Sequence, residues 1–484
     1  MSISAAFSNA LSGLGASSRL AQIVSANVAN AMTDGYGRKT LGLSSASVGG
    51  VGAGVRIDGV SREVNQGLLA DRRLSNAAVG AAGVKSGFFK SVERTLGAPT
   101  EADSLSSKIA AFESALIEAS AGPESPIRLS NVVRTAQGVT QHLNKTSDVI
   151  GDARLKADQD IDRQVTLLNK TIKQVDKLND QILRSTANGR DASGLMDQRQ
   201  VVVDQIAQIV PLKIMMRDNS QIALFTTNGA TLLDGQPSEI GFEAAGRMAP
   251  HFSIDTGFLS GLTLNGEMVR PDETGLLGGG SLSASFELRD ELTVEAQSQV
   301  DAIARDLIER LADASVDPTY TAGSAGFFTD AGQPLDAADE IGLSGRISVN
   351  ALVDPVEGGE LWRLRDGLAA SAPGDVGNNS FLSNISDALA DARTPASGGF
   401  GPATRSASGL IDNLLSQYST ERQNAELSQT FATAQQETLR EEELRRGVDT
   451  DQELQTLLQV EQAYAANARV MQTLDGLLRD LLEI

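Results

Sequence analysis

His142 and His251 are the only two histidines in the sequence, and they are the first residues to consider for acid–base catalysis or metal binding. Imidazole is the side chain whose ordinary pKa lies closest to neutral pH, which suits it to both tasks. His142 lies in a region with helical periodicity, and His251 follows Pro250 in a region of short strands. Isolated histidines of this kind are far more often ordinary core or surface residues than catalytic groups, so we assign neither a role.

Motifs for catalysis and ligand binding do not occur elsewhere in the sequence. There is no Cys, which excludes disulfides, zinc fingers, iron–sulfur clusters and thiol nucleophiles. The zinc-protease, nucleophile-elbow, phosphate-loop and calcium-loop patterns are also missing. The triplet Gly278-Gly279-Gly280 precedes a predicted helix but follows no good strand, which argues against a nucleotide site. We therefore predict that the protein is not an enzyme and needs no cofactor or metal.

The charge of the chain limits its partners. It has 62 acidic and 41 basic residues, a net charge of −21, and no long cluster of Lys or Arg. This balance argues against binding to nucleic acid or to an anionic membrane surface. No run of 18 apolar residues could form a membrane span, and residues 1–18 lack the basic residues of a secretory signal. Any export is expected to use another route.

The first thirty residues have the spacing of an amphipathic helix. Small and apolar residues recur at intervals of four and three, and Gly35 and Gly37 then provide turn conformations that end the helix. The predicted seam consists of Ile3, Phe7, Ala10, Leu14, Ser17, Ala21, Val24 and Val28.

The last thirty residues show the same spacing. One polar member, Asn467, is typical of a residue that sets register or partner choice in a helical seam. Each terminal seam could belong to a core helix of its own domain. Neither has an amphipathic neighbour close in sequence, however, so we predict that the two pair with each other or with another subunit. The C-terminal seam consists of Leu457, Val460, Tyr464, Asn467, Met471, Leu474, Leu478 and Leu481.

The interior is predicted to be mainly helical. A seam from 129 to 185 keeps three- and four-residue spacing, and one helix of that length would extend roughly 80 Å. Residues 212–226 instead alternate around Asp218-Asn219-Ser220, which predicts a hairpin. The other predicted helices are 82–122 with an interruption at 97–99, 194–210, 283–314 and 408–446.

Two segments lack strong periodicity. Residues 41–60 are rich in Gly, Ser and Val and are predicted to form a loop with a short strand. Residues 315–404 are rich in Gly, Ser, Asp and Pro, with one credible strand at 346–353. We expect this second segment to be an irregular, outward-facing insertion that tolerates deletion.

These elements predict a mainly α fold with β-rich middle segments. The N- and C-terminal helices pair as a coiled coil beside a long-helix core domain, which carries an outer β or irregular insertion. The predicted domains are 1–40 with 448–484 as a terminal coiled-coil inner domain, 41–211 with 281–314 and 405–447 as the helical core, 212–280 as a β-rich segment, and 315–404 as the outer insertion.

Motifs at both ends carry a family resemblance. The N-terminal blocks are Ala10–Leu14, Ser25–Asn30 and Thr33–Arg38, and the C-terminal blocks are Gly447–Asp449, Glu461–Tyr464 and Ala466–Val470. Together they closely resemble the terminal signatures of the bacterial flagellar rod, hook and hook-associated proteins. The chain departs from that pattern at three positions: the family has Asn and Pro near the turn that contains Met32 and Asp34, and Gln at the position of Lys39.

Interior blocks resemble the hook-associated members of this family. They are Gly194–Arg199, Gly278–Leu282 with Phe286–Leu292, and Phe327-Phe328. The resemblance implies a structural subunit at the junction between hook and filament, with terminal helices that line an axial channel. It also implies type III export without a cleaved signal and a place in the secreted, extracellular flagellum. The implied partners are other copies in a ring or helical lattice, the hook protein, the next hook-associated protein and the filament, and an export chaperone.

We assign the assembly interface to the two terminal seams and the turn after the first. Rival interpretations are a hook or distal rod protein, which should be richer in strands, and a coiled-coil surface adhesin, which would need a signal or an anchor. An enzyme carried in residues 315–404 would have no His, Cys or Lys there. The predicted interface residues are Leu14, Val24, Asn27, Val28, Asn30, Gly35, Tyr36, Leu457, Val460, Tyr464, Asn467, Met471, Leu474, Leu478 and Leu481.

Overall fold

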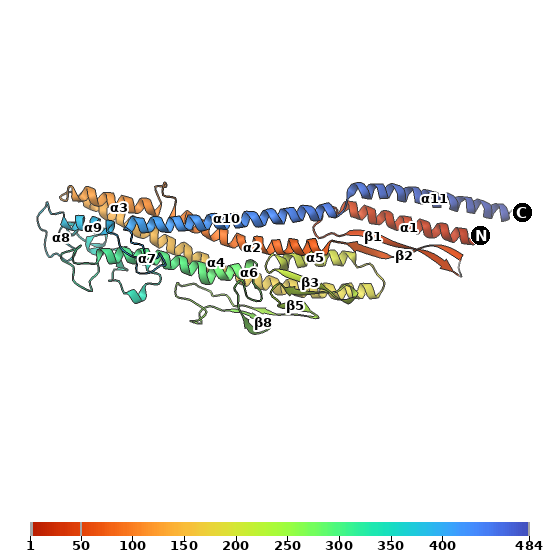
Figure 1. Cartoon of the computed structure of the whole chain (residues 1–484), viewed down its shortest axis with the longest axis horizontal. Coiled ribbons are helices and arrows are strands. Elements are labelled where there is room, and N and C mark those ends of the chain that lie inside the picture. Colours follow the sequence, from red (N-terminus) through yellow and green to blue (C-terminus); the bar gives the residue numbers. More distant parts are fainter. Residues whose placement is uncertain (1–2, 49–50, 483–484) are drawn as a thin grey trace.

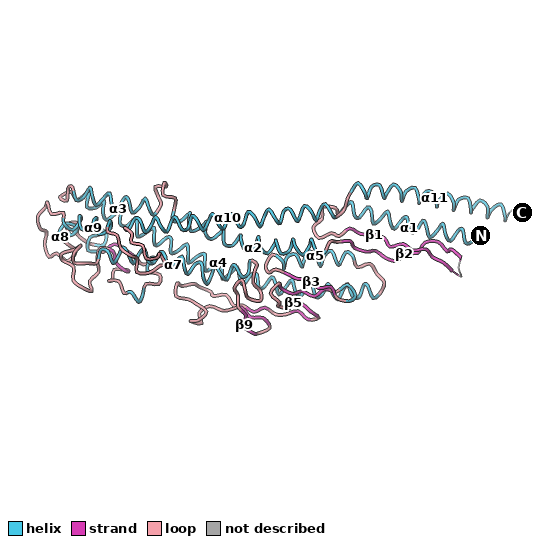
Figure 2. The backbone as a smooth tube through the Cα atoms, viewed as in Figure 1, coloured by secondary structure: helices cyan, strands magenta, loops and turns pink. Residues whose placement is uncertain are grey.

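The computed structural model describes residues 3–48 and 51–482. The chain forms a slender rod with both termini at one end (Figure 1). The terminal helices and a hairpin form a narrow arm there, long helices run through the body, and short helices and loops close the far tip (Figure 2). The predicted fold class, mainly α with strands in the middle and paired terminal helices, is confirmed.

The helices account for most of the described chain. A π-helical turn, Leu288–Leu292, divides the predicted helix 283–314 and places the buried Arg289 guanidinium 2.8 Å from the Asp158 carboxylate. The helices are α1 (Ile3–Ala29), α2 (Gln66–Leu96), α3 (Leu105–Ser120), α4 (Pro126–Ala187), α5 (Ser193–Ala207), α6 (Ser281–Glu287), α7 (Thr293–Leu311), α8 (Arg363–Asp366), α9 (Ser380–Ala390), α10 (Ala407–Arg446) and α11 (Thr450–Leu482).

The strands form four small antiparallel sheets within the described residues. The predicted hairpin at 212–226 is confirmed, with Leu212 opposite Thr226. The strands are β1 (Arg38–Val48), β2 (Val51–Glu63), β3 (Leu212–Met216), β4 (Ile222–Thr226), β5 (Thr231–Asp234), β6 (Gln236–Pro237), β7 (Ile240–Gly241), β8 (Leu262–Leu264), β9 (Glu267–Val269), β10 (Phe328–Asp330) and β11 (Ile347–Val349).

Helix α4 is the spine of the rod. Its 62 residues extend about 93 Å, and Pro126 begins it at a position where a missing N–H costs nothing. The apolar residues that recur along it at three- and four-residue spacing are buried, among them Val133, Leu143, Ile150, Ile161, Leu168 and Ile182. The stretch from Leu129 to Ile150 lies in a hydrophobic core near the tip, and the stretch from Ile161 to Leu178 lies in a second core that includes the strands β3–β5. One helix thereby joins two cores into a single body.

The expectation of a loop with a short strand at 41–60 is wrong. Strands β1 and β2 form a long hairpin, with Thr40 opposite Ser61 and bulges further along it. The hairpin lies against α1, where the Val55 N–H donates to the Ser12 hydroxyl at 3.1 Å. Glycines and serines masked the strand pattern because they weaken the apolar alternation by which strands are recognised.

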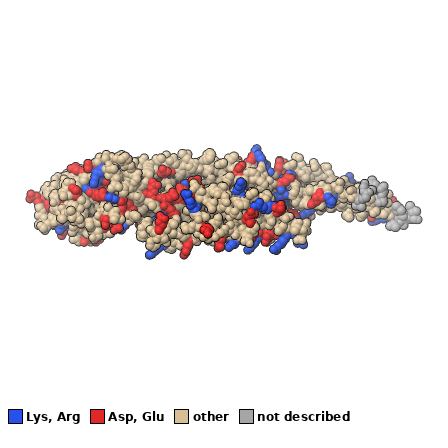
Figure 3. Space-filling view, turned by 60° about the horizontal axis from the view of Figure 1, so that its bottom comes forward, with Lys and Arg blue, Asp and Glu red and all other residues tan. Residues whose placement is uncertain are grey.

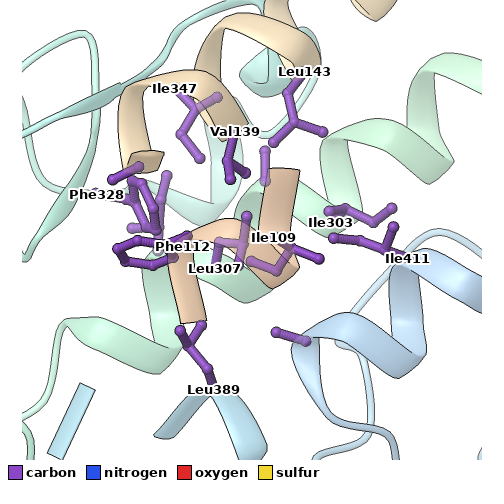
Figure 4. Packing of buried hydrophobic residues seen from close by; sticks show 14 of the residues in the cluster. Ile109, Phe112, Val139, Leu143, Ile303, Leu307, Phe328, Ile347, Leu389 and Ile411 are labelled. Atoms are coloured by element: carbon purple, nitrogen blue, oxygen red, sulfur yellow. The ribbon is translucent and has the colours of Figure 1, made fainter. Parts of the chain in front are cut away.

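Residues 315–404 were predicted to be an irregular, outward-facing insertion, but several of their apolar residues are buried in the tip core. Phe328, Ile347 and Leu389 point into the tip core with residues of α3, α4, α7 and α10 (Figure 4). The Phe112 ring stacks on the Phe327 ring at a centroid distance of 5.7 Å. The polar composition of the segment hid the few, widely spaced apolar residues that are buried in the core. The helix α9 was not predicted, although its apolar residues recur at helical spacing.

Truncating an anchor of this segment should therefore unfold the tip core. Phe328→Ala removes a fully buried ring, and we expect a loss of roughly 3–5 kcal/mol in the free energy of unfolding, measured by urea titration followed by circular dichroism. The matched control is Val356→Ala in the same segment, where the side chain is 88% exposed and the change should be within about 0.5 kcal/mol. Equal effects of the two changes would contradict this account.

Candidate assembly surface and its joint to the body

The two terminal helices lie side by side and run antiparallel, with α1 ending where α11 begins (Figure 1). Val24 of α1 and Val460 and Leu474 of α11 are buried in the arm. The helices approach closely at Gly13, where an added Cβ would lie 2.8 Å from Asn467 Nδ2. Asn467 itself donates to the Ala463 carbonyl of its own helix at 3.0 Å. The spacing of the seams had left two arrangements open, pairing with each other or with another subunit. The structure shows the two terminal helices of one chain paired with each other.

The predicted interface residues divide by burial. Val24, Asn27, Val460 and Leu474 are buried, whereas Tyr464 and Leu478 are 48% and 39% exposed. The side chain of Leu481 lies outside the described residues. The remaining predicted residues are partly buried, namely Leu14, Val28, Asn30, Gly35, Tyr36, Leu457, Asn467 and Met471.

Other apolar residues of the arm face outward. Leu454 and Leu458 are 50% and 59% exposed, and their four-residue spacing places them on one flank of α11. Val470 and Leu477, 45% and 48% exposed and seven residues apart, lie on the opposite flank relative to the buried Val460. We call these two pairs the flank stripes. These four residues are absent from the predicted interface because that prediction followed a single seam, although a second periodic set was readable.

Asn27 occupies the joint between the arm and the body. The side chain is 1% exposed, and all of its hydrogen-bonding capacity is used. Its Nδ2 donates to the Lys39 carbonyl at 2.9 Å and to Glu453 Oε2 at 3.1 Å. Its Oδ1 accepts from the Tyr36 hydroxyl at 2.9 Å and the Lys39 N–H at 3.0 Å. One carboxamide therefore ties α1, the turn after it, β1 and α11 together.

Glu453 brings the start of α11 into this joint. The carboxylate is 2% exposed, and Oε1 accepts from Arg38 Nε at 2.8 Å. The hydrogen bond to Glu453 raises the pKa of Arg38 above its ordinary value. Glu453 lies four residues before Leu457 and continues its seam, but it was not among the predicted interface residues.

Asp197 of α5 attaches the joint to the body. Its Oδ1 accepts from the Gly37 N–H at 3.0 Å and from Arg62 Nε at 2.7 Å, and Oδ2 lies 3.2 Å from Lys39 Nζ. Gly35 has a φ of +78° and packs where a Cβ would lie 2.5 Å from Val201 Cγ2, so only glycine fits there. The sequence blocks at 33–38 and 194–199 therefore meet at this carboxylate.

A second set of ion pairs clamps the helices beneath the joint. Arg72 and Arg73 of α2 both contact Asp204 of α5. The distance from Arg73 Nε to Asp204 Oδ1 is 2.6 Å. Arg72 Nε also lies 2.6 Å from the Glu443 carboxylate of α10. Elsewhere on the body, acidic and basic side chains are interspersed without an extended basic face in the view of Figure 3.

Neither histidine belongs to the joint. His142 is buried, its Nε2 has no hydrogen-bond partner among the described residues, and burial lowers its pKa below the ordinary value. The His251 ring instead packs edge-on against Phe252 at a centroid distance of 5.0 Å. Within the part of the chain that the structure describes, no group of three or more potential ligands could hold a metal ion. No helix of that part is long and apolar enough to cross a membrane.

Two segments of the chain match family models of flagellar proteins. Residues 89–326 match a family model described as the flagellar hook-associated protein FlgK helical domain. Residues 445–484 match one described as the flagellar basal body rod FlgEFG protein C-terminal. The paired terminal helices and the helical body thus define a flagellar axial protein. Within that class, the chain is similar to flagellar hook-associated protein 1, and it is a structural component of the extracellular flagellum that assembles with other axial components.

Individual relatives cover the chain to different extents. Flagellar hook-associated protein 1 of Bacillus subtilis is 23% identical over 93% of this chain and 92% of its own length. The Salmonella typhimurium protein of the same name is 29% identical over 48% of this chain and 43% of its own length. The solved structure of the flagellar hook junction protein FlgK from Burkholderia pseudomallei aligns with a TM-score of 0.44 and 16% identity over 54% of this chain and 46% of that chain.

Removing the carboxamide of Asn27 should loosen the contacts among α1, the hairpin and α11 at the joint. Asn27→Ala leaves the Lys39 N–H and carbonyl and Glu453 Oε2 without the bonds to Asn27, while Glu453 Oε1 keeps its bond to Arg38, and we expect a loss of roughly 1–3 kcal/mol in the local stability of the arm. Hydrogen exchange should show faster exchange in α1 and α11 and unchanged exchange in α4. The control is Asn30→Ala, because Asn30 bonds mainly to the Ala26 carbonyl of its own helix. Unchanged exchange in Asn27→Ala would contradict the assignment of the joint.

Tyr36 provides a pH test of the same joint. Burial, aided by the carboxylates of Asp197 and Glu453, raises the pKa of Tyr36 to about 12. Because the unfolded phenol ionises near pH 10, the stability from this group is complete below about pH 10 and is lost as the pH rises towards 12. We expect the absorbance change of phenolate formation to show a component near pH 12 that Tyr36→Phe removes. Ionisation of Tyr36 near pH 10 would mean that the phenol is solvated.

Proposed function

We propose that the chain is a subunit of the junction between the flagellar hook and filament, and that copies of it assemble through the flank stripes of α11. The exposure of four large apolar side chains on a helix whose seam is already covered by α1 carries the proposal. Large apolar side chains that remain exposed on a helix are candidates for contact with another protein surface.

The position of the stripes favours a ring or a helical lattice. Leu454 and Leu458 lie on one flank and Val470 and Leu477 on the other, so two different surfaces are available to two neighbours. Contact between unlike surfaces repeats from copy to copy and generates a closed ring or an open helix. Full burial of one leucine contributes about 1.5–3 kcal/mol, so several such residues from each copy provide a stable contact.

The proposed neighbours follow from the family. We place the hook protein on one side of the subunit and the next hook-associated protein and the filament on the other. An export chaperone would cover the flank stripes before assembly, and export would use the flagellar type III route. Most of the predicted interface residues then stabilise the arm within one chain. Tyr464 and Leu478, which are more exposed, contribute to contacts between copies.

The predicted domain boundaries remain part of this proposal. The terminal helices would form the inner layer around the channel, and the long-helix body would form the wall. The hairpin β1–β2 packs on α1, which supports adding residues 41–63 to the terminal unit rather than to the body.

Two substitutions separate contacts within the chain from contacts between copies. Leu474→Asp places a carboxylate at a position that is 8% exposed, and it should lower the melting temperature of the arm in the isolated monomer. Leu458→Asp, at 59% exposure, should leave monomer melting unchanged but yield cells with hooks and without filaments. The control, Val356→Asp at the tip, should support normal filaments. Normal filaments with Leu458→Asp would overturn the assignment of the stripes.

A further inference from the structure

A cavity of about 680 Å³ lies where the arm meets the body. Its walls come from α1, the strand β2, the start of α2, the helix α5 and the hairpin β3–β4. The chain as a whole has a net charge of −21, yet five arginines line this cavity beside two aspartates. The arginines are Arg19, Arg62, Arg73, Arg190 and Arg199, and the aspartates are Asp58 and Asp191.

Three of these arginines have acidic partners within the chain. Arg62 pairs with Asp197 and Arg73 with Asp204 at 2.7 and 2.6 Å, and Arg19 lies 3.7 Å from Asp191. The second lining carboxylate, Asp58, lies 2.9 Å from Arg56 Nε. Two positive charges, those of Arg190 and Arg199, form no ion pair within the described residues.

Arg199 is the more informative of the two. It is 6% exposed, and only its Nη1 forms hydrogen bonds among the described residues, to Asn179 Oδ1 at 2.8 Å and the Ser220 carbonyl at 2.7 Å. Burial and the neighbouring guanidinium of Arg62 lower the pKa of Arg199 to about 10, which still leaves the side chain charged at neutral pH. A buried charge without a counterion is costly unless a partner supplies one.

We propose that this cavity receives a carboxylate side chain of a second copy of the chain, which Arg199 and Arg190 bind. The inference rests on the proposed function, because it requires that copies assemble. The acidic excess of the chain supplies many candidate carboxylates, and arginine forks bind carboxylates with two parallel hydrogen bonds. The cavity is also continuous with the arm, since Arg19 of α1 and residues Ile57–Arg62 of β2 form part of its wall.

The chain offers a direct test by photo-cross-linking in assembled flagella. Met216 lines the cavity and is 57% exposed, so p-benzoylphenylalanine at position 216 leaves both arginines in place. We expect irradiation to produce a dimer of this chain, with mass spectrometry identifying a peptide that contains Asp or Glu. The matched control is the same substitution at Met268, which is 72% exposed on β9 and does not line the cavity.

Substitutions then test the role of the charge. Arg199→Gln should lower the yield of the dimer at least tenfold, Arg199→Lys should retain most of it, and Arg270→Gln at an exposed pair with Asp272 should have no effect. Thermal melting of each isolated monomer shows whether the variant is folded, and Arg190→Gln provides a second variant at an exposed position should Arg199→Gln unfold the chain.

Three outcomes would overturn the inference. They are a cross-link from position 216 to hook protein or another axial protein, no cross-link to a second copy in intact flagella, and a yield that Arg199→Gln does not change. A rise in monomer melting temperature with phosphate over chloride at equal ionic strength, lost in Arg199→Gln and without a dimer, would instead identify an inorganic anion. The proposed function is tested separately, by whether cells that carry Leu458→Asp form filaments.

Discussion

The hydrogen bonds of one buried carboxamide hold α1, the turn, the hairpin and α11 in one arrangement at the joint. Asn27 has no unused donor or acceptor, and its partners come from the turn, the hairpin and the C-terminal helix. A buried polar group that is fully satisfied specifies one geometry, because any shift leaves a donor or a carboxylate without a partner. The arrangement of α1, β1 and α11 at the joint is thereby specified by directional hydrogen bonds as well as by apolar packing.

Ion pairs around this joint connect residues of the arm with residues of the body. Glu453 is held by Arg38, and Asp197 is shared by Gly37, Arg62 and Lys39. Lys39 is a position where the chain departs from the family pattern, and here it contacts both Asp197 and the Tyr36 ring, 4.8 Å from the ring centroid. The departure at Asp34 likewise creates an ion pair with Arg440 at 3.2 Å, although that pair is exposed and contributes little.

Periodicity predicted the parts of the fold that depend on long helices. The seam of α4 was readable because a helix packed along its whole length must repeat its apolar residues. The hairpin β1–β2 and the segment 315–404 were not, because Gly and Ser dilute the pattern and isolated anchors such as Phe328 and Leu389 become a core only after distant segments meet. For the candidate site, the motif blocks identified Asn27 and Tyr36, but nothing in the sequence pairs Asp197 with a turn 160 residues away.

The terminal seams were predicted to form the assembly interface. In the structure, the buried seam residues of α11 pack within the chain, and other apolar residues of α11 remain exposed. Val460 and Leu474 are covered by α1 of the same chain, so they cannot also contact a neighbour. Apolar side chains that remain exposed, Leu458 among them, are the ones free to do so. A helix that must pair within its own chain and also join a lattice needs apolar residues around more of its circumference than one seam provides. Under the proposed assembly, this requirement accounts for the combination of a buried seam with an exposed apolar pair on each flank of α11.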